Sequence, residues 1–387
     1  MSWEPNVIER AMRELGAKQG SGGRSDRMVP VINCTADGTS WGAAPAEAMT
    51  PHDFFKGFTD ASVFTHAATG DPLLYKLKGW PSQAEFRERL PRHHAHFIRG
   101  LPFPEYTNPC DGPLNLVTHL PRSVGQPDLG PRASIAFGRP EERGPGDSVT
   151  RLHASVMDGV HALMYSCDAA AGACAEAVGD DDDGDGGEGR GGGEDGGGGA
   201  GDGHHTHGRP VSVGADAPHA TDGHVGGDGG ASWQIFRRED IPAVSAFVLS
   251  HRSALAHCPP ASTAVHHPIY DATFFLTAAE LALLLEETHG EVAPWSFHLH
   301  DNDAVLVPAG CPQQVRNLKS CLKVALDFVS PETMPAALAM NDDIRELPAG
   351  HAGRSDNVHA RVTLLHAAHV AVHELQALQG AGPDASL

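Results

Sequence analysis

The chain has 387 residues, of which 40% are hydrophobic and 20% are charged, and its formal net charge is −21 at pH 7. This length can bury a large core, whereas the negative charge argues against a nucleic-acid-binding surface formed by net charge alone. We therefore expect no direct sequence-specific nucleic-acid binding. We also expect no membrane contact, because no apolar run is long enough to span a bilayer and the start of the chain lacks a signal-peptide pattern.

The seven cysteines are scattered, and no two of them form a CxxC pair. The spacing therefore indicates neither a zinc ribbon nor a disulfide framework. An odd number of unpaired thiols is typical of a protein from a reducing compartment.

The first half of the chain is predicted to begin with a helix and to continue into strands. Apolar residues at helical spacing predict a helix over residues 5–15. A second, amphipathic helix is predicted around residues 92–96, where the histidines are read as a solvated helix face and not as metal ligands. Alternating or continuous apolar runs predict strands over residues 134–137 and 160–165.

Residues 179–231 are dominated by Gly, Asp and His, with runs of four aspartates and four glycines. Such a composition cannot bury enough apolar surface to offset the entropy of ordering the chain. We predict a disordered insertion here, which separates two ordered halves of one core.

The second half alternates between predicted helices and short strands. Helices are predicted over residues 239–255, 278–288 and 358–378, and in the second of these Thr277 and Glu280 form a capping-box pattern. This half begins with the largely apolar residues 233–236, and strands are predicted over residues 295–299, 304–307 and 322–328. Short strands with turn signals and flanking helices indicate a mainly β protein, a double-sheet jelly roll with helical decoration.

One strand-like segment, residues 146–155, carries the pattern of a metal site with one ligand missing. Iron/2-oxoglutarate oxygenases hold Fe(II) with two histidines and one carboxylate, and the first two ligands usually form a His-x-Asp or His-x-Glu pair. Side chains at i and i+2 of a strand point to the same face, so both can reach one metal. Here His153 occupies the first position, but Ser155 occupies the second.

Several longer motifs extend this pattern over most of the chain outside the insertion. They lie at residues 90–93 (Leu-Pro-Arg-His), 101–107 (Leu-Pro-Phe-Pro-Glu-Tyr-Thr), 127–131 (Pro-Asp-Leu-Gly-Pro), 236–242 (Phe-Arg-Arg-Glu-Asp-Ile-Pro), 307–312 (Val-Pro-Ala-Gly-Cys-Pro), 314–321 (Gln-Val-Arg-Asn-Leu-Lys-Ser-Cys) and 323–332 (Lys-Val-Ala-Leu-Asp-Phe-Val-Ser-Pro-Glu). Together they resemble the JmjC family, and specifically the plant or algal form of the histone demethylases that act on lysine 9 of histone H3.

The resemblance implies a cupin-like JmjC domain, the double-stranded β-helix, that uses Fe(II) and 2-oxoglutarate to hydroxylate an N-methyl group of lysine and release formaldehyde. It also implies a nuclear protein whose partners are the histone H3 tail or chromatin complexes. The expected organisation is an N-terminal helical and mixed segment at 1–100 packing on the core, jelly-roll halves at 101–178 and 232–335 around the insertion at 179–231, and a C-terminal helical segment at 336–387.

Carried over residue by residue, the implied site is damaged. His153 matches the first metal histidine, Ser155 stands at the carboxylate position, and Gln313 stands where the distal histidine is expected. Thr150 and His161 match positions near the cosubstrate, where His161 replaces an asparagine. The cosubstrate lysine should fall near residue 170, but no lysine lies between residues 151 and 231.

These substitutions favour a catalytically impaired JmjC protein that acts in chromatin or transcription regulation. One alternative is an active histone lysine demethylase with an atypical metal site. Another is a rebuilt site of His153, His161 and His298 that would prefer Zn or Ni; the competing interpretation is that these are ordinary histidines. On a regular strand His161 would share the face of His153, whereas Asp158 would face away.

Overall fold

The computed structural model describes residues 2–17, 28–35, 47–78, 81, 83–171, 229–354 and 358–380. Most of the predicted insertion, residues 179–228, therefore lies outside the described residues. Its predicted end is wrong by three positions, because Gly229 and Gly230 are buried and Ala231 already begins a strand.

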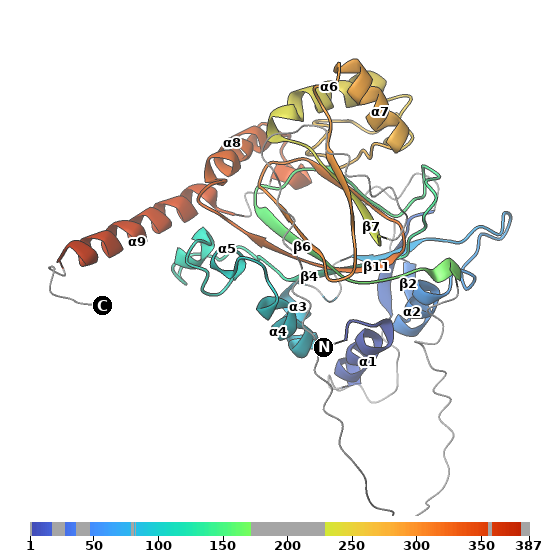
Figure 1. The fold of residues 1–387 in the computed structure, drawn as a ribbon, viewed down its shortest axis with the longest axis horizontal. Helices are drawn as coiled ribbons and strands as arrows, with labels where there is room; N and C mark the ends of the chain where they lie inside the picture. The colour runs from blue at the N-terminus through green and yellow to red at the C-terminus, as the bar shows by residue number, and fades with distance from the viewer. Residues whose placement is uncertain are drawn as a thin grey trace, which may run out of the picture.

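Two antiparallel sheets form the core (Figure 1). The larger has the strand order β2-β1-β3-β4-β11-β6-β9, and the smaller has the order β5-β10-β7-β8. The strands are β1 Val29–Asn33, β2 Glu47–Met49, β3 Tyr75–Lys78, β4 Arg132–Ala136, β5 Val149–His153, β6 Asp158–Cys167, β7 Ala231–Ile235, β8 Trp295–Leu299, β9 Ala304–Val307, β10 Gln313–Asn317 and β11 Ser320–Phe328. Side chains of both sheets, such as Leu163 and Trp233, share one buried cluster between them. The predicted jelly roll is confirmed.

Strand β11 shows how the two faces of the large sheet divide. Leu322, Val324, Leu326 and Phe328 belong to an outer hydrophobic cluster with N-terminal residues, whereas Asp327 lines an internal cavity. Successive side chains of a strand alternate between faces. One row of β11 therefore holds helices against the sheet, and the other row faces the interior of the jelly roll.

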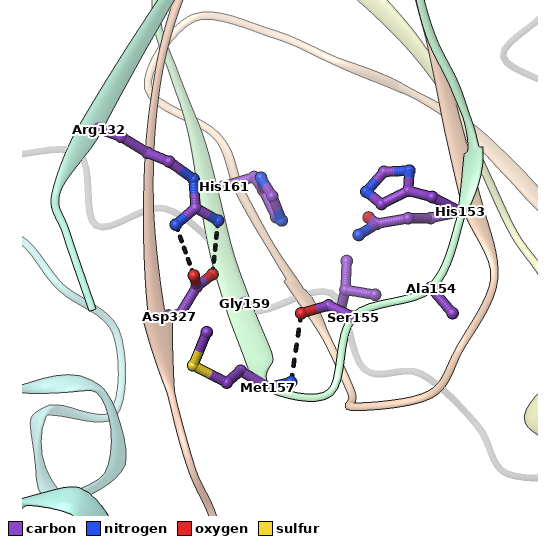
Figure 2. A pocket seen from close by; sticks show the side chains of 10 residues that line it. Arg132, His153, Ala154, Ser155, Met157, Gly159, His161 and Asp327 are labelled. Atoms are coloured by element: carbon purple, nitrogen blue, oxygen red, sulfur yellow. Dashed lines mark hydrogen bonds and ion pairs between the residues drawn. The ribbon is translucent and has the colours of Figure 1, made fainter. Parts of the chain in front are cut away.

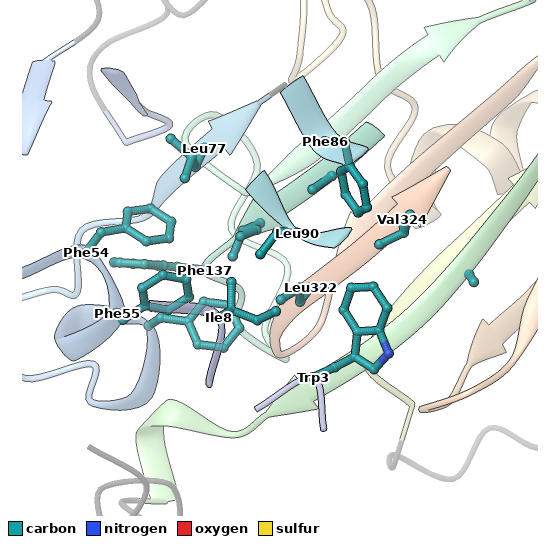
Figure 3. Close-up of a cluster of buried hydrophobic side chains, with 14 of the residues drawn as sticks. Trp3, Ile8, Phe54, Phe55, Leu77, Phe86, Leu90, Phe137, Leu322 and Val324 are labelled. Atoms are coloured by element: carbon teal, nitrogen blue, oxygen red, sulfur yellow. The ribbon is translucent and has the colours of Figure 1, made fainter. Parts of the chain in front are cut away.

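Helices cover the outer face of the large sheet and pack through aromatic residues (Figure 3). They are α1 Pro5–Ala17, α2 Pro51–Thr59, α3 Gln83–Arg89 and α4 Pro91–Arg99. Phe54, Phe55 and Phe86 are almost completely buried in this cluster. The helices expected at residues 5–15 and around 92–96 are confirmed as α1 and α4.

A second cluster places α6 Ile241–His251 and α7 Ala278–Glu287 beside the smaller sheet, through Leu152, Phe247 and Leu284. The capping box of Thr277 and Glu280 is confirmed. The helix predicted over 239–255 is shorter than expected, because it starts after a 3-10 turn, Arg238–Asp240, and ends at His251.

The remaining helices are α5 Pro104–Thr107, α8 Met334–Arg345 and α9 Ala360–Gly380, with 3-10 turns at Leu116–His119, Ala169–Ala171 and Ala352–Arg354. The C-terminal part of α9 extends away from the body of the protein (Figure 1). Among the described helices, none combines the length and the apolar character needed to cross a bilayer.

Candidate functional site

A cavity of about 220 Å³ lies inside the jelly roll at one end of the two sheets (Figure 2). Residues from both sheets and from the β5–β6 connection line it: Arg132, His153, Ala154, Ser155, Met157, Gly159, His161, Val307, Gln313 and Asp327. Four of the five residues singled out from the sequence therefore face one space, although they come from three strands and a loop.

His153 ends β5 and lies at the cavity wall. Its Nδ1 lies 2.7 Å from the backbone oxygen of Arg151. Because a carbonyl only accepts hydrogen bonds, this contact requires the proton on Nδ1, and the lone pair of the neutral ring then sits on Nε2. This is the tautomer in which a histidine can act as a metal ligand through Nε2.

Ser155 follows β5 in the connection to β6, and hydrogen bonds to backbone amides hold it in place. The carbonyl of Ser155 accepts a hydrogen bond from the Gly310 amide at 2.7 Å. Its Oγ accepts one from the Met157 amide at 3.2 Å (Figure 2). The hydroxyl is therefore used to shape the turn, and it brings no negative charge to the cavity.

Gln313 begins β10 and pairs directly with His153 on the neighbouring antiparallel strand. Only 3% of this residue is exposed. Its Oε1 is buried and has no hydrogen-bond partner among the described residues. A buried amide oxygen without a partner is uncommon and destabilising. This oxygen therefore either lowers the stability of the fold or accepts a hydrogen bond from a bound group.

His161 faces the cavity from β6. The prediction that it shares this space with His153 assumed one regular strand, and that assumption is wrong, because His153 ends β5 of the smaller sheet and His161 lies on β6 of the larger. Its ring packs 5.2 Å from the ring of Trp233, measured between centroids. Burial, together with the positive charges of Arg132 and Lys323 and with nearby His153, lowers the pKa of His161 to about 3. The imidazole is therefore neutral at physiological pH.

The sequence interpretation missed the ion pair between Arg132 and Asp327. The guanidinium donates to both carboxylate oxygens of Asp327, at 2.5 and 2.6 Å (Figure 2). Neither residue was expected to line the site, although alternation along β11 places Asp327 on the inward row. Asp327 is the one carboxylate among the described residues that line the cavity, and Arg132 neutralises it.

Other expected residues lie elsewhere. Thr150 is exposed and does not line the cavity. Ala170, near the expected lysine position, is also exposed. Lys323 is buried, and its ammonium donates to the Asn317 side-chain oxygen at 2.6 Å; burial lowers the pKa of Lys323.

The residues present do not fit an Fe(II) site of two histidines and one carboxylate. Of the three matching positions only His153 offers a strong ligand, and Asp327, the one carboxylate among the described lining residues, is paired with Arg132. In the described part of the chain, no group of three or more His, Cys, Asp or Glu residues is arranged to hold a metal.

The rebuilt three-histidine site is wrong. His298 lies on β8, pairs with Ser232 of β7 and does not line the cavity. Asp158 faces away from the interior, as predicted, and accepts hydrogen bonds from the amides of Ala309 and Ser330 and from the Thr333 hydroxyl.

Comparison with known proteins gives one family match. Residues 221–328 match the model of the JmjC domain, described as a hydroxylase. The chain is 32% identical to Lysine-specific demethylase JMJ27 of Arabidopsis thaliana, over 98% of this chain and 51% of that protein. It is 35% identical to Lysine-specific demethylase JMJ29 of the same plant, over 94% of this chain and 39% of that protein.

A further relative carries a different name. The E3 ubiquitin-protein ligase JMJ24 of Arabidopsis thaliana is 29% identical over 97% of this chain and 40% of that protein. The chain thus spans about half, or less, of the length of the curated relatives it matches.

Proposed function

Since this chain carries a JmjC domain and is similar over nearly its whole length to lysine-specific demethylases, we propose that it is a nuclear JmjC protein of the type related to histone H3 lysine-9 demethylases, which has lost oxidative catalysis. It would act in transcription or chromatin regulation by binding the histone H3 tail or chromatin complexes, without iron or 2-oxoglutarate.

One observation carries this proposal. The positions that should complete the metal site hold Ser155 and Gln313, and the only carboxylate among the described lining residues is paired with Arg132. Two neutral side chains cannot compensate the charge of Fe(II). Changes in the outer shell of a metal site already reduce affinity or activity about 10–100-fold, so the loss of two direct ligands has a larger effect.

Two further facts support the proposal. The resemblance puts the cosubstrate lysine near residue 170, but no lysine lies between residues 151 and 231, so a charge-assisted hydrogen bond worth about 1.5–3 kcal/mol is lost. The name of the relative JMJ24 refers to ubiquitin ligation, so similarity of this kind does not by itself imply demethylation.

The alternative is an active demethylase with an atypical metal site. It rests on two potential metal ligands on directly paired residues, the His153 imidazole and the Gln313 Oε1, which has no hydrogen-bond partner in the part of the chain that the structure describes. Carbonyl oxygens suit hard divalent cations, but a site without a carboxylate binds them weakly.

The test is an anaerobic titration with Fe(II) and 2-oxoglutarate that follows the visible metal-to-ligand charge-transfer band. We expect no band for the unmodified chain and a band for the double variant Ser155→Asp plus Gln313→His, which restores both ligands. The matched control is Ser155→Asn plus Gln313→His, which differs by a single charge.

Two results would count against the proposal. A band in the unmodified chain, followed by demethylation of a methylated H3 peptide, would establish the alternative. Binding of an H3-tail peptide only in the presence of Fe(II) and 2-oxoglutarate would show that recognition still depends on the cofactors.

A further inference from the structure

Two uncharged polar side chains in the internal cavity have unused hydrogen-bonding atoms. The first is Gln313 on β10, whose buried Oε1 has no partner in the part of the chain that the structure describes. The second is His161 on β6 of the facing sheet. Its ring packs against Trp233, but no hydrogen bond joins it to another described residue. Buried polar groups normally have partners, so the two side chains together point to a bound molecule.

Gly159 keeps the space beside His161 open. A Cβ at this position would lie 2.8 Å from His161 Nε2 and 3.8 Å from Asp327 Oδ1, and Gly159 itself lines the cavity. Its φ lies outside the left-handed region, so the backbone conformation does not require a glycine here. The missing side chain therefore leaves room for a ligand next to the imidazole.

The cavity has no charge left over to attract an ion. Arg132 donates hydrogen bonds to both carboxylate oxygens of Asp327 (Figure 2). The low pKa of His161 keeps its ring neutral, and Ser155 and Gln313 carry no charge. Burying an ion is costly unless an opposite charge compensates it. The cavity therefore favours an uncharged ligand over a metal ion or an anion.

An amide is the chemical complement of these side chains. The Gln313 side chain carries an acceptor oxygen beside an NH₂ donor, and a neutral imidazole carries one donor and one acceptor. A ligand with N–H and C=O side by side can pair with the Gln313 amide in either of its two orientations. The volume of about 220 Å³ is below the usual lower limit of about 300 Å³ for drug-sized ligands, so it suits one ring. Apolar contacts for that ring come from Ala154, Met157 and Val307.

We propose that the internal cavity binds a small, uncharged amide on a ring-sized apolar body, in place of iron and 2-oxoglutarate. The inference rests on the proposed loss of metal binding, because Fe(II) and 2-oxoglutarate would occupy the same space. The amide would give hydrogen-bond partners to Gln313 and His161, which have none among the described residues.

The test uses benzamide as the probe, with benzoate and benzylammonium as an anion and a cation of similar size. Each is titrated against the full chain in EDTA, and binding is followed by saturation-transfer NMR. We expect saturable binding of benzamide with a dissociation constant of about 1 mM, as for a good ligand of this size. The two charged probes should bind at least about fivefold more weakly, because the cavity offers no free counter-charge.

Two variants locate the binding site. Gln313→Met removes the amide at similar length, and Gly159→Ala fills the space beside His161. Each is expected to weaken benzamide binding at least about fivefold. The matched controls are Gln376→Met, on an exposed part of α9, and Gly125→Ala, where a Cβ would meet open space. Both controls should bind benzamide like the unmodified chain, and thermal unfolding checks the fold of each variant.

Three outcomes would overturn the inference. They are no saturable binding of benzamide, equal binding by Gln313→Met, and tighter binding of benzoate, which would show that the cavity still selects an anion. The charge-transfer titration separates this failure from that of the proposed function. No band and no benzamide binding would overturn the amide alone, whereas a band in the unmodified chain would overturn both.

Discussion

Gln313 lies directly opposite His153 on the adjacent antiparallel strands β10 and β5. The pairing puts an amide where the second histidine of a metal site would meet the first. The amide oxygen finds no hydrogen-bond partner among the described residues. Glutamine in place of the expected histidine therefore leaves a buried polar atom without a hydrogen bond at the centre of the implied site.

Replacing Gln313 with an apolar side chain of similar length should remove this defect. A buried polar atom without a partner costs about 1–3 kcal/mol, so Gln313→Met is expected to leave the free energy of unfolding unchanged or to raise it by about 1 kcal/mol. The neighbouring Gln314 is the control, because its side-chain amide is fully used. Its Oε1 accepts a hydrogen bond from the Leu276 backbone N–H, and its Nε2 donates one to the Leu276 carbonyl. In urea unfolding, Gln314→Met should destabilise by about 1–3 kcal/mol; equal losses in both variants would contradict this account.

The ion pair of Arg132 and Asp327 is expected to stabilise the cavity end of the large sheet. Removing one partner of a buried pair costs about 3–5 kcal/mol, but the side chain of Arg132 is 36% exposed. We therefore expect Asp327→Asn to lower the free energy of unfolding by about 1–3 kcal/mol. Asp342→Asn removes two exposed pairs, with Arg345 and with Arg361, and should change the free energy of unfolding by less than about 1 kcal/mol. Similar values for the two variants would mean that the inner pair is no stronger than a surface pair.

His161 should make the stability depend on pH. Its pKa is lowered to about 3 in the folded protein and is near 6.5 when unfolded. Well above pH 6.5 the imidazole is neutral in both states and has no effect on the pH dependence of stability. As the pH falls from 6.5 towards 3, the unfolded state takes up the proton and the folded state does not, so stability is lost. At pH 5 the loss is about 1–2 kcal/mol.

The measurement is urea unfolding at pH 7.5 and pH 5 for the unmodified chain and for His161→Asn. Other histidines titrate in the same range, so the informative quantity is the difference between the two proteins. The variant should lose less stability on acidification. Parallel pH profiles would show that His161 is not held neutral by the fold.

Gly310 should be required for the loop that leads into Gln313. It has a φ of +81°, and a Cβ there would lie 2.7 Å from Nε of Arg238. Its amide also bonds the carbonyl of Ser155. Gly290 is a matched control, with φ at +85° and open space around the position of its Cβ.

Alanine at either glycine adds backbone strain of about 1 kcal/mol or more. Gly310→Ala should be destabilised beyond Gly290→Ala, because Arg238 must also move away from the Ala309 carbonyl. Thermal unfolding of both variants measures the difference. Equal melting temperatures would show that the Arg238 contact contributes nothing.

Much of the local structure was predictable because its causes are local. Strands β8 and β9 have the predicted bounds, and the capping box of α7 depends on residues three positions apart. Strand β10 was not predicted, since its sequence, Gln-Gln-Val-Arg-Asn, has little apolar character. It is a strand because β5 and β7 pair with it on both sides.

The sequence by itself determined which side chains stand at the implied metal positions, since Ser155 and Gln313 are fixed by motifs that surround them. Only the tertiary structure decided which other side chains line the same cavity as these two residues. Arg132 and Asp327 are 195 positions apart, and strand pairing between β4 and β11 brings them together. Likewise, His298 was a plausible ligand on the basis of alternation, but its strand lies at the far edge of the smaller sheet. Alternation fixes which face of a strand a residue occupies, whereas the order of strands in the sheet, a non-local property, decides which residues share a cavity.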